Sequence, residues 1–135
     1  MNGELDQILA DFLIEAQENL ERLERELGQL EQDPDNEELL RRVFRIMHSL
    51  KGNATFLNLA QLEQIAHQTE NVLAKLRDHS ITFVPELNTV LFQSIDSIKS
   101  MLAHLEKTGE EGEFDLELML GDLKAVLNGT WDGNV

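Results

Sequence analysis

The residues best placed to do chemistry surround His48. Four of the chain's 11 basic residues lie in one short stretch around it: Arg41, Arg42, Arg45 and Lys51. A local cationic patch on a chain of net charge −15 indicates that an anion is handled there. Lys51 is one helical turn from His48 and on the same face. The cluster could instead be an ordinary solvated helix face, because a single histidine in a helix is usually just a half-exposed polar residue.

Gly52 lies one turn after His48, inside what should be a helix. Glycine in a helix interior costs about 1 kcal/mol relative to alanine, so its presence needs a reason. The absence of a side chain beside the imidazole leaves room for a phosphoryl group and for the active site of a second protein. The pattern therefore favours His48 as a nucleophile that takes up an anionic group.

A second pair of candidate residues, His67 and Glu70, lies one turn apart in the next helical stretch. The turn between the two stretches centres near Leu57 and Asn58. His48 is about ten residues before this turn and His67 about nine after it, so both lie roughly 15 Å from the turn. Glu70 is one turn further along and within reach of His48 if the faces meet. A carboxylate that accepts the Nδ1 proton would fix the tautomer and leave Nε2 as the nucleophile. We expect this carboxylate to be partly solvated.

These side chains must be positioned by helices, because hydrophobic residues recur at steps of three and four along five stretches. The stretches predict helices at about 4–31, 36–56, 59–78, 85–107 and 114–127. The segment Asp33-Pro34-Asp35 should end the first helix, since proline cannot continue it and aspartate favours the turn and the next N-cap. Four long amphipathic helices with short connections predict an all-α fold, an antiparallel up-down-up-down four-helix bundle. The additional C-terminal fifth helix should cap or flank it.

The composition excludes several classes of function. With 26 acidic residues against 11 basic ones, the surface should repel nucleic acid and anionic membranes. The chain has no cysteine, which excludes disulfides and thiol chemistry. Neither a signal peptide nor a long apolar run is recognisable, so we expect a cytoplasmic location. A Leu-rich core in five helices should give a monomer that unfolds cooperatively.

Three segments of the chain carry a resemblance to a known family. His48-x-x-Lys51-Gly52-x-Ala54-x-x-x-Asn58 closely resembles the phosphorylation motif of histidine phosphotransfer (Hpt) domains. Ala66-His67-x-x-Glu70-Asn71-x-Leu73 is similar to the matching segment in the N-terminal phosphotransfer domain of chemotaxis histidine kinases of the CheA type. The opening Phe12-Leu13-x-Glu15-Ala16-x-Glu18-x-Leu20 resembles the first helix of that domain. The resemblance covers about residues 5–127.

By this resemblance His48 is the phosphoacceptor and Glu70 its hydrogen-bond partner. Lys51 and His67 would belong to the surrounding network. One position departs from the pattern, since the family usually has glycine where this chain has Asn58. Asparagine is the best non-glycine residue for a left-handed helix end, so we expect the turn to survive.

The basic cluster and the missing side chain at Gly52 predict how the site would meet its partners. Arg45, Gly52 and Arg41 would contact the phosphoryl group or the partner protein, with Arg45 and Lys51 facing the acidic pocket of a response regulator. The Hpt domain would span residues 1–128, and residues 129–135 would form a flexible tail or the start of a linker.

The implied function is phosphotransfer. A kinase domain, in the same chain or another, would phosphorylate the domain, which would then pass the group to an aspartate of a response regulator receiver domain. The sequence has no P-loop and no glycine-rich nucleotide lid, so no autonomous catalysis and no bound cofactor are expected of this domain. ATP would be used by the kinase domain and Mg²⁺ by the response regulator. The whole would be part of a histidine protein kinase.

Two other classes of function remain open at this point. Helical bundles host di-iron sites through Glu-x-x-His pairs on facing helices. Here the order is reversed, as His67-x-x-Glu70, and no second pair exists. The other alternative is a docking or structural bundle without chemistry, which would leave Gly52 and the basic cluster unexplained.

Overall fold

The computed structural model describes residues 3–129, with side chains from residue 6 onward, and these residues contain helices and no strand. The helices are α1 (Gly3–Gln32), α2 (Glu37–Phe56), α3 (Ala60–Arg77), α4 (Pro85–Thr108) and α5 (Glu117–Asn128). The first four predicted helices are therefore confirmed to within one residue at each end. Of the expected C-terminal tail, only Gly129 lies within the described residues. In this part of the chain, no helix is long and apolar enough to cross a membrane.

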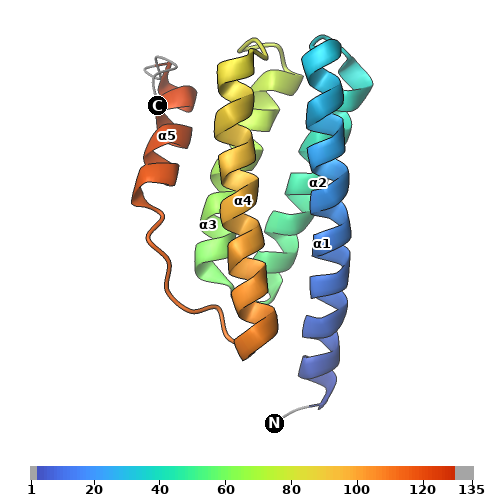
Figure 1. Cartoon of the computed structure of the whole chain (residues 1–135), viewed down its shortest axis with the longest axis vertical. Coiled ribbons are helices and arrows are strands. Elements are labelled where there is room, and N and C mark those ends of the chain that lie inside the picture. Colours follow the sequence, from blue (N-terminus) through green and yellow to red (C-terminus); the bar gives the residue numbers. More distant parts are fainter. Residues whose placement is uncertain (1–2, 130–135) are drawn as a thin grey trace.

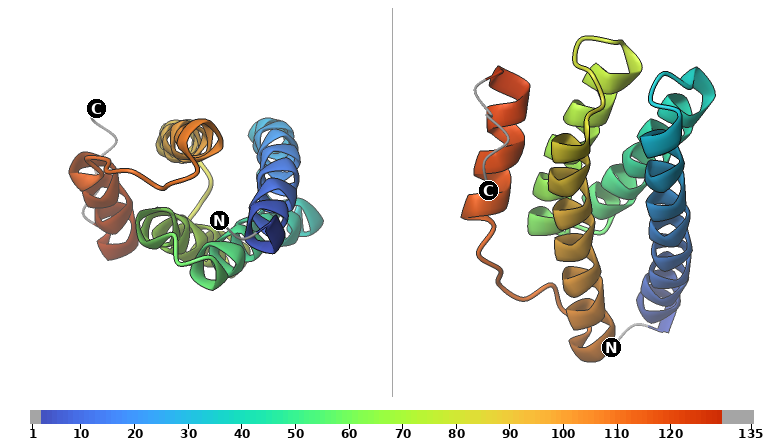
Figure 2. Two further views of the ribbon diagram at one scale, coloured as in Figure 1. Left: turned by 90° about the horizontal axis from the view of Figure 1, so that it is seen from below. Right: turned by 45° about the horizontal axis from the view of Figure 1, so that its top comes forward.

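The first four helices form the predicted antiparallel bundle (Figure 1). α1 packs against α2 and α4, and α3 packs against the same two helices, so the four close a ring in chain order. α5 contacts only α3 and α4 among the described helices and lies on the opposite side of the bundle from α1 (Figure 2). The fifth helix thus flanks the bundle rather than capping its end.

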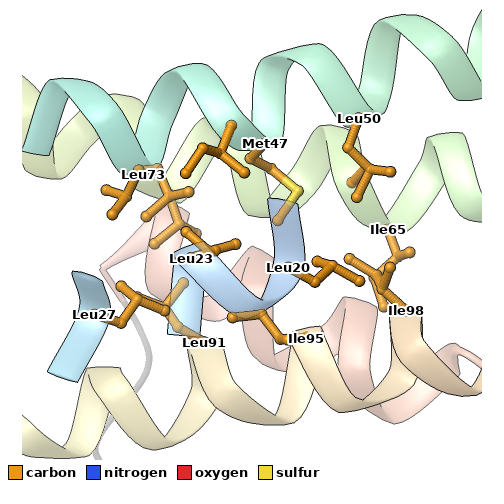
Figure 3. Close-up of a cluster of buried hydrophobic side chains, with 14 of the residues drawn as sticks. Leu20, Leu23, Leu27, Met47, Leu50, Ile65, Leu73, Leu91, Ile95 and Ile98 are labelled. Carbon is orange, nitrogen blue, oxygen red and sulfur yellow. The ribbon is translucent and has the colours of Figure 1, made fainter. Parts of the chain in front are cut away.

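The core is built from the apolar stripes that predicted the helices, and all four bundle helices contribute to it (Figure 3). Its labelled members are Leu20, Leu23, Leu27, Met47, Leu50, Ile65, Leu73, Leu91, Ile95 and Ile98. Each is at most 3% exposed. Because these side chains are closely packed, the rotation of α2 and α3 about their axes is fixed. The packing therefore also fixes which residues of the two helices face each other.

The turn between α2 and α3 forms as expected at Asn58, which adopts the left-handed conformation with φ 59°. The N–H of Asn58 donates to the carbonyl of Thr55 at 3.1 Å, and the N–H of Leu59 donates to that of Ala54 at 2.9 Å. This pair of bonds is the Schellman arrangement, which satisfies carbonyls at the end of a helix. The other end of α2 is capped by Asn36, whose side chain accepts a hydrogen bond from the N–H of Leu39 at 3.1 Å. The cap thus lies one residue after Asp35, the position that the sequence favoured.

The predicted start of the fifth helix at 114 is wrong, because the helix begins at Glu117. The segment before it is held by other elements. The N–H of Phe114 donates to Gln61 of α3 at 2.8 Å, and the Phe114 ring lies edge-on to His104 of α4, with 5.6 Å between centroids. Glu111 accepts from the N–H of Leu62 at 2.8 Å and so caps the start of α3. These long-range contacts keep the segment out of a helix.

Candidate functional site

The two helices on either side of the Asn58 turn bring His48 of α2 and Glu70 of α3 into contact. Nδ1 of His48 pairs with Oε2 of Glu70 across 22 positions of sequence. Nζ of Lys51 lies 3.0 Å from the other oxygen, Oε1. The predicted pairing between the two helices is therefore present, and it includes Lys51.

Glu70 is more buried than the sequence suggested. Its side chain is 8% exposed, whereas His48 is 59% and Lys51 24% exposed. The expectation of a partly solvated carboxylate was wrong, because the core packing of α2 against α3 covers it. A buried carboxylate needs both oxygens satisfied, and His48 and Lys51 each satisfy one.

Glu70 is a carboxylate at neutral pH. Burial alone would raise its pKa, but the hydrogen bonds from His48 and Lys51, together with the charge of Lys51, outweigh this and hold the pKa of Glu70 below its ordinary value. An ionised carboxylate only accepts hydrogen bonds, so Nδ1 of His48 must carry the proton. In the neutral ring this tautomer leaves the lone pair on Nε2, to which the structure gives no hydrogen-bond partner among the described residues. The arrangement suits an exposed nucleophile.

Two further residues lie at the site that the sequence did not single out for it. The ring of Phe44, one turn before His48, stacks on the imidazole with 5.8 Å between centroids and 14° between planes. The guanidinium carbon of Arg77, at the end of α3, lies 4.1 Å from the centroid of the Phe44 ring. The four-residue spacing of Phe44 and His48 is visible in the sequence, but it does not show that the two rings stack. Arg77 carried no local signal.

His67 lies on α3, one turn before Glu70, and its side chain is 48% exposed. The ion pair that the structure gives it is to Glu63 on its own helix, with 3.9 Å between Nδ1 and Oε1. Its predicted membership of the network around His48 stays a prediction.

The basic cluster divides into residues with different surroundings. Arg42 is tied to α1 and to its own helix, through Glu26 at 2.6 Å and Glu38 at 3.2 Å. Arg41 and Arg45 are exposed, and neither forms an ion pair with any residue that the structure describes. Arg41 and Arg45 are therefore the members of the cluster free to meet a partner.

Gly52 is exposed in the middle of α2, and a Cβ added there would meet nothing within 4 Å. Internal packing therefore does not require glycine at this position. The fold alone does not account for a residue that costs about 1 kcal/mol in a helix.

A metal site in a protein usually needs three or more ligating side chains in one place. Among the side chains of residues 6–129, no three of His, Asp or Glu come together where they could hold a metal ion. The position next to Glu70 is occupied by the cation of Lys51.

Comparisons with known proteins identify the family. The family model described as Hpt domain matches residues 7–125. The chain is 37% identical over 127 residues to the sensor histidine kinase CheAY of Helicobacter pylori, covering 91% of this chain and 16% of the relative. It is 31% identical to the chemotaxis protein CheA of Listeria monocytogenes, covering 87% and 19%. The chain thus spans less than a fifth of the length of these relatives.

Solved structures resemble the whole bundle. The solution structure of a histidine phosphotransfer domain of CheA aligns with a TM-score of 0.81 at 27% identity, covering 89% of this chain and 91% of the other. The CheA phosphotransferase domain from Thermotoga maritima aligns with a TM-score of 0.72 at 30% identity, covering 77% and 98%. A phosphorylated P1 domain of CheA3 in complex with CheY6, from R. sphaeroides, aligns with a TM-score of 0.83 at 24% identity, covering 91% and 98%, and shares the fold.

Proposed function

We propose the following function for this chain, which belongs to the Hpt domain family. In this chain, Nε2 of His48 accepts the phosphoryl group from ATP bound to a histidine kinase domain. The group then passes to an aspartate of a response regulator receiver domain. The parent protein is a chemotaxis-type histidine kinase, of which this chain is the phosphotransfer part.

The observation that carries this proposal is the contact of His48 with a buried, ionised Glu70. When Nε2 attacks the γ-phosphorus of ATP, the bond to the bridging oxygen breaks and ADP leaves. The ring gains positive charge, and the carboxylate at Nδ1 offsets it. Transfer reverses the step: the N–P bond breaks, the aspartate oxygen takes the phosphoryl group, and the ring returns to neutral. The domain thus supplies an oriented nucleophile in the first step and the leaving group in the second. The kinase domain supplies ATP, and the receiver domain supplies Mg²⁺.

The relatives support the assignment of partners. The solved P1 domain of CheA3 is described in complex with CheY6, and the curated relatives are chemotaxis proteins. An acidic receiver pocket would complement the free cations Arg41 and Arg45 on the helix that carries His48. Since the kinase domain requires ATP, we propose that the domain works in the cytoplasm.

The proposal is tested by following one phosphoryl group through both steps. The chain is incubated with labelled ATP, Mg²⁺ and the kinase domain of a CheA-type relative, purified, and mixed with a receiver domain and Mg²⁺. Acid-labile label should appear on the chain and then move to the receiver. As a control, each kinase domain must phosphorylate the Hpt domain of its own parent protein. If such active kinase domains leave this chain unlabelled, the result would support the docking alternative instead.

Replacing Gly52 by alanine is expected to separate stability from function. The added Cβ meets nothing inside the domain, so Gly52→Ala should raise the free energy of unfolding by about 0.5–1 kcal/mol. Phosphotransfer to the receiver should nevertheless slow, because the methyl group fills space beside His48 that the partner needs. Thermal unfolding and stopped-flow transfer measure the two effects. Transfer at the wild-type rate would mean that Gly52 does not serve the partner.

Removing two cations near His48 should slow transfer moderately. Arg45 is exposed, so its contacts with a partner are individually weak and screened by salt. Lys51 also holds one oxygen of the buried Glu70, so its removal additionally weakens the support of His48. The double change Arg45→Ala and Lys51→Ala should therefore slow transfer several-fold, and more at low than at high ionic strength. Arg25→Ala, an exposed arginine of α1, is the matched control. Unchanged transfer at low salt would reduce the cluster to a solvated face.

A further inference from the structure

We propose that Arg77 and Phe44 are positioning residues for the phosphorylation of His48: the guanidinium holds the Phe44 ring, and that ring holds the plane of the imidazole. The inference rests on the proposed function, because ring orientation matters only if Nε2 takes up a phosphoryl group. It assigns a task to a residue 29 positions after the histidine.

The contact with Glu70 leaves one freedom of the imidazole unrestrained. It fixes the tautomer and the place of Nδ1, but the ring can still rock about that contact, since the last torsion of histidine is broad. The His48 side chain is 59% exposed, so few neighbours limit this motion. Attack on phosphorus needs the Nε2 lone pair in line with the bond that breaks, and misorientation lowers the rate.

Phe44 supplies a restraint on the face of the ring. It lies one turn before His48 on α2, where side chains four residues apart meet. A centroid distance of 5.8 Å with planes only 14° apart is an offset stack, an arrangement that aromatic pairs prefer. Tilting the imidazole breaks this contact. His48 is therefore held at one edge by Glu70 and on one face by Phe44.

Arg77 in turn restrains Phe44. Its guanidinium carbon lies 4.1 Å from the centroid of the phenyl ring, within the range of a cation–π contact. Nε of Arg77 donates to Oδ1 of Asp78 at 3.0 Å, which directs the planar group. The planar guanidinium suits an aromatic face in a way that a lysine ammonium does not. The contacts join the C-terminal end of α3 to the ring that carries the reaction.

The test compares phosphorylation rates of variants at saturating kinase and ATP. Phe44→Leu removes the ring and keeps apolar volume; Arg77→Met keeps the aliphatic length and removes the guanidinium. We expect Phe44→Leu to lower the maximal rate about three- to tenfold and Arg77→Met about two- to fivefold. The domain concentration at half-maximal rate should stay unchanged. Arg25→Met, the same change at an exposed arginine of α1, is the matched control and should stay within about twofold of wild type.

Two further measurements distinguish positioning from general structural damage. In the double variant Phe44→Leu with Arg77→Met, the second change should add nothing, because Arg77 acts through Phe44. Relaxation of the labelled His48 ring by NMR should show greater mobility in both single variants, while its nitrogen shifts keep the tautomer set by Glu70. A full Arg77 effect in the Phe44→Leu background would overturn the proposal, and so would wild-type rates or an unchanged ring mobility.

Wild-type protein in the same assay separates the two levels of inference. If wild type is not phosphorylated on His48, the proposed function fails. If wild type is phosphorylated and Phe44→Leu matches its rate, only the positioning role fails.

Discussion

Replacing His48 by glutamine is expected to abolish phosphorylation of the chain while leaving its helices intact. In the proposed reaction Nε2 of His48 is the nucleophile. The amide nitrogen of glutamine has no lone pair available for attack on phosphorus. The side chain is 59% exposed, so the substitution opens no cavity. Radiolabel from ATP should fall to background, and circular dichroism should remain that of the wild type.

The control for this experiment is a histidine away from the site. His79 adopts the left-handed conformation with φ 61°, which asparagine tolerates well, and its side chain contacts Glu37. His79→Asn should therefore be phosphorylated like wild type. Continued labelling of His48→Gln, with the phosphate mapped to His67, would contradict the assignment of the acceptor.

Replacing Glu70 by alanine is expected to slow phosphorylation about ten- to a hundredfold without abolishing it. Side chains that transfer a proton in the transition state accelerate a reaction by up to about 10²–10⁴. Glu70 acts only through the imidazole ring, so its effect should lie toward or below the lower end of this range. The nucleophile itself remains. Glu70→Gln should lie between wild type and alanine, because an amide oxygen accepts the Nδ1 hydrogen bond but does not offset the imidazolium charge. Wild-type initial rates in both variants would show that the contact does not assist the reaction.

The same variants should also change stability, because Glu70 is buried. Removing one partner of a fully buried ion pair costs about 3–5 kcal/mol, but Lys51 and His48 are partly exposed and can return to water, so about 1–2 kcal/mol is expected for Glu70→Ala. The pKa of Glu70 is lowered in the folded state from its ordinary 4.5. Its contribution to stability is therefore present above about pH 4.5 and is lost as the pH falls through the lower native value. Glu70→Gln should lack this part of the acid dependence.

Much of the fold and the main contact of the site follow from local patterns. Apolar residues at steps of three and four predict helices because a helix repeats every 3.6 residues, and the four long helices begin and end almost where expected. Two antiparallel helices rise at the same rate from their shared turn, so the spacing from Asn58 places His48 level with His67 and within one turn of Glu70. The structure pairs His48 with Glu70. The left-handed Asn58 was expected from the glycine that the resembling family has at this position, because asparagine tolerates the same conformation.

What could not be predicted depends on contacts between residues far apart in the sequence. The burial of Glu70 follows from how closely α2 packs on α3, and the start of α5 follows from the hold of Gln61 on the segment before it. The same is true of the stack on His48: Arg77 reaches Phe44 from another helix, and neither residue type nor spacing reveals which face of the ring is covered.

The central claim, that the phosphoryl group resides on Nε2 of His48, is tested most directly by NMR of the phosphorylated, ¹⁵N-labelled domain. We expect one phosphorylated imidazole, that of His48. Its spectrum should show phosphorus–nitrogen coupling to Nε2 and a proton retained on Nδ1 beside Glu70. Phosphate on Nδ1 of His48, or on any other residue, would contradict it.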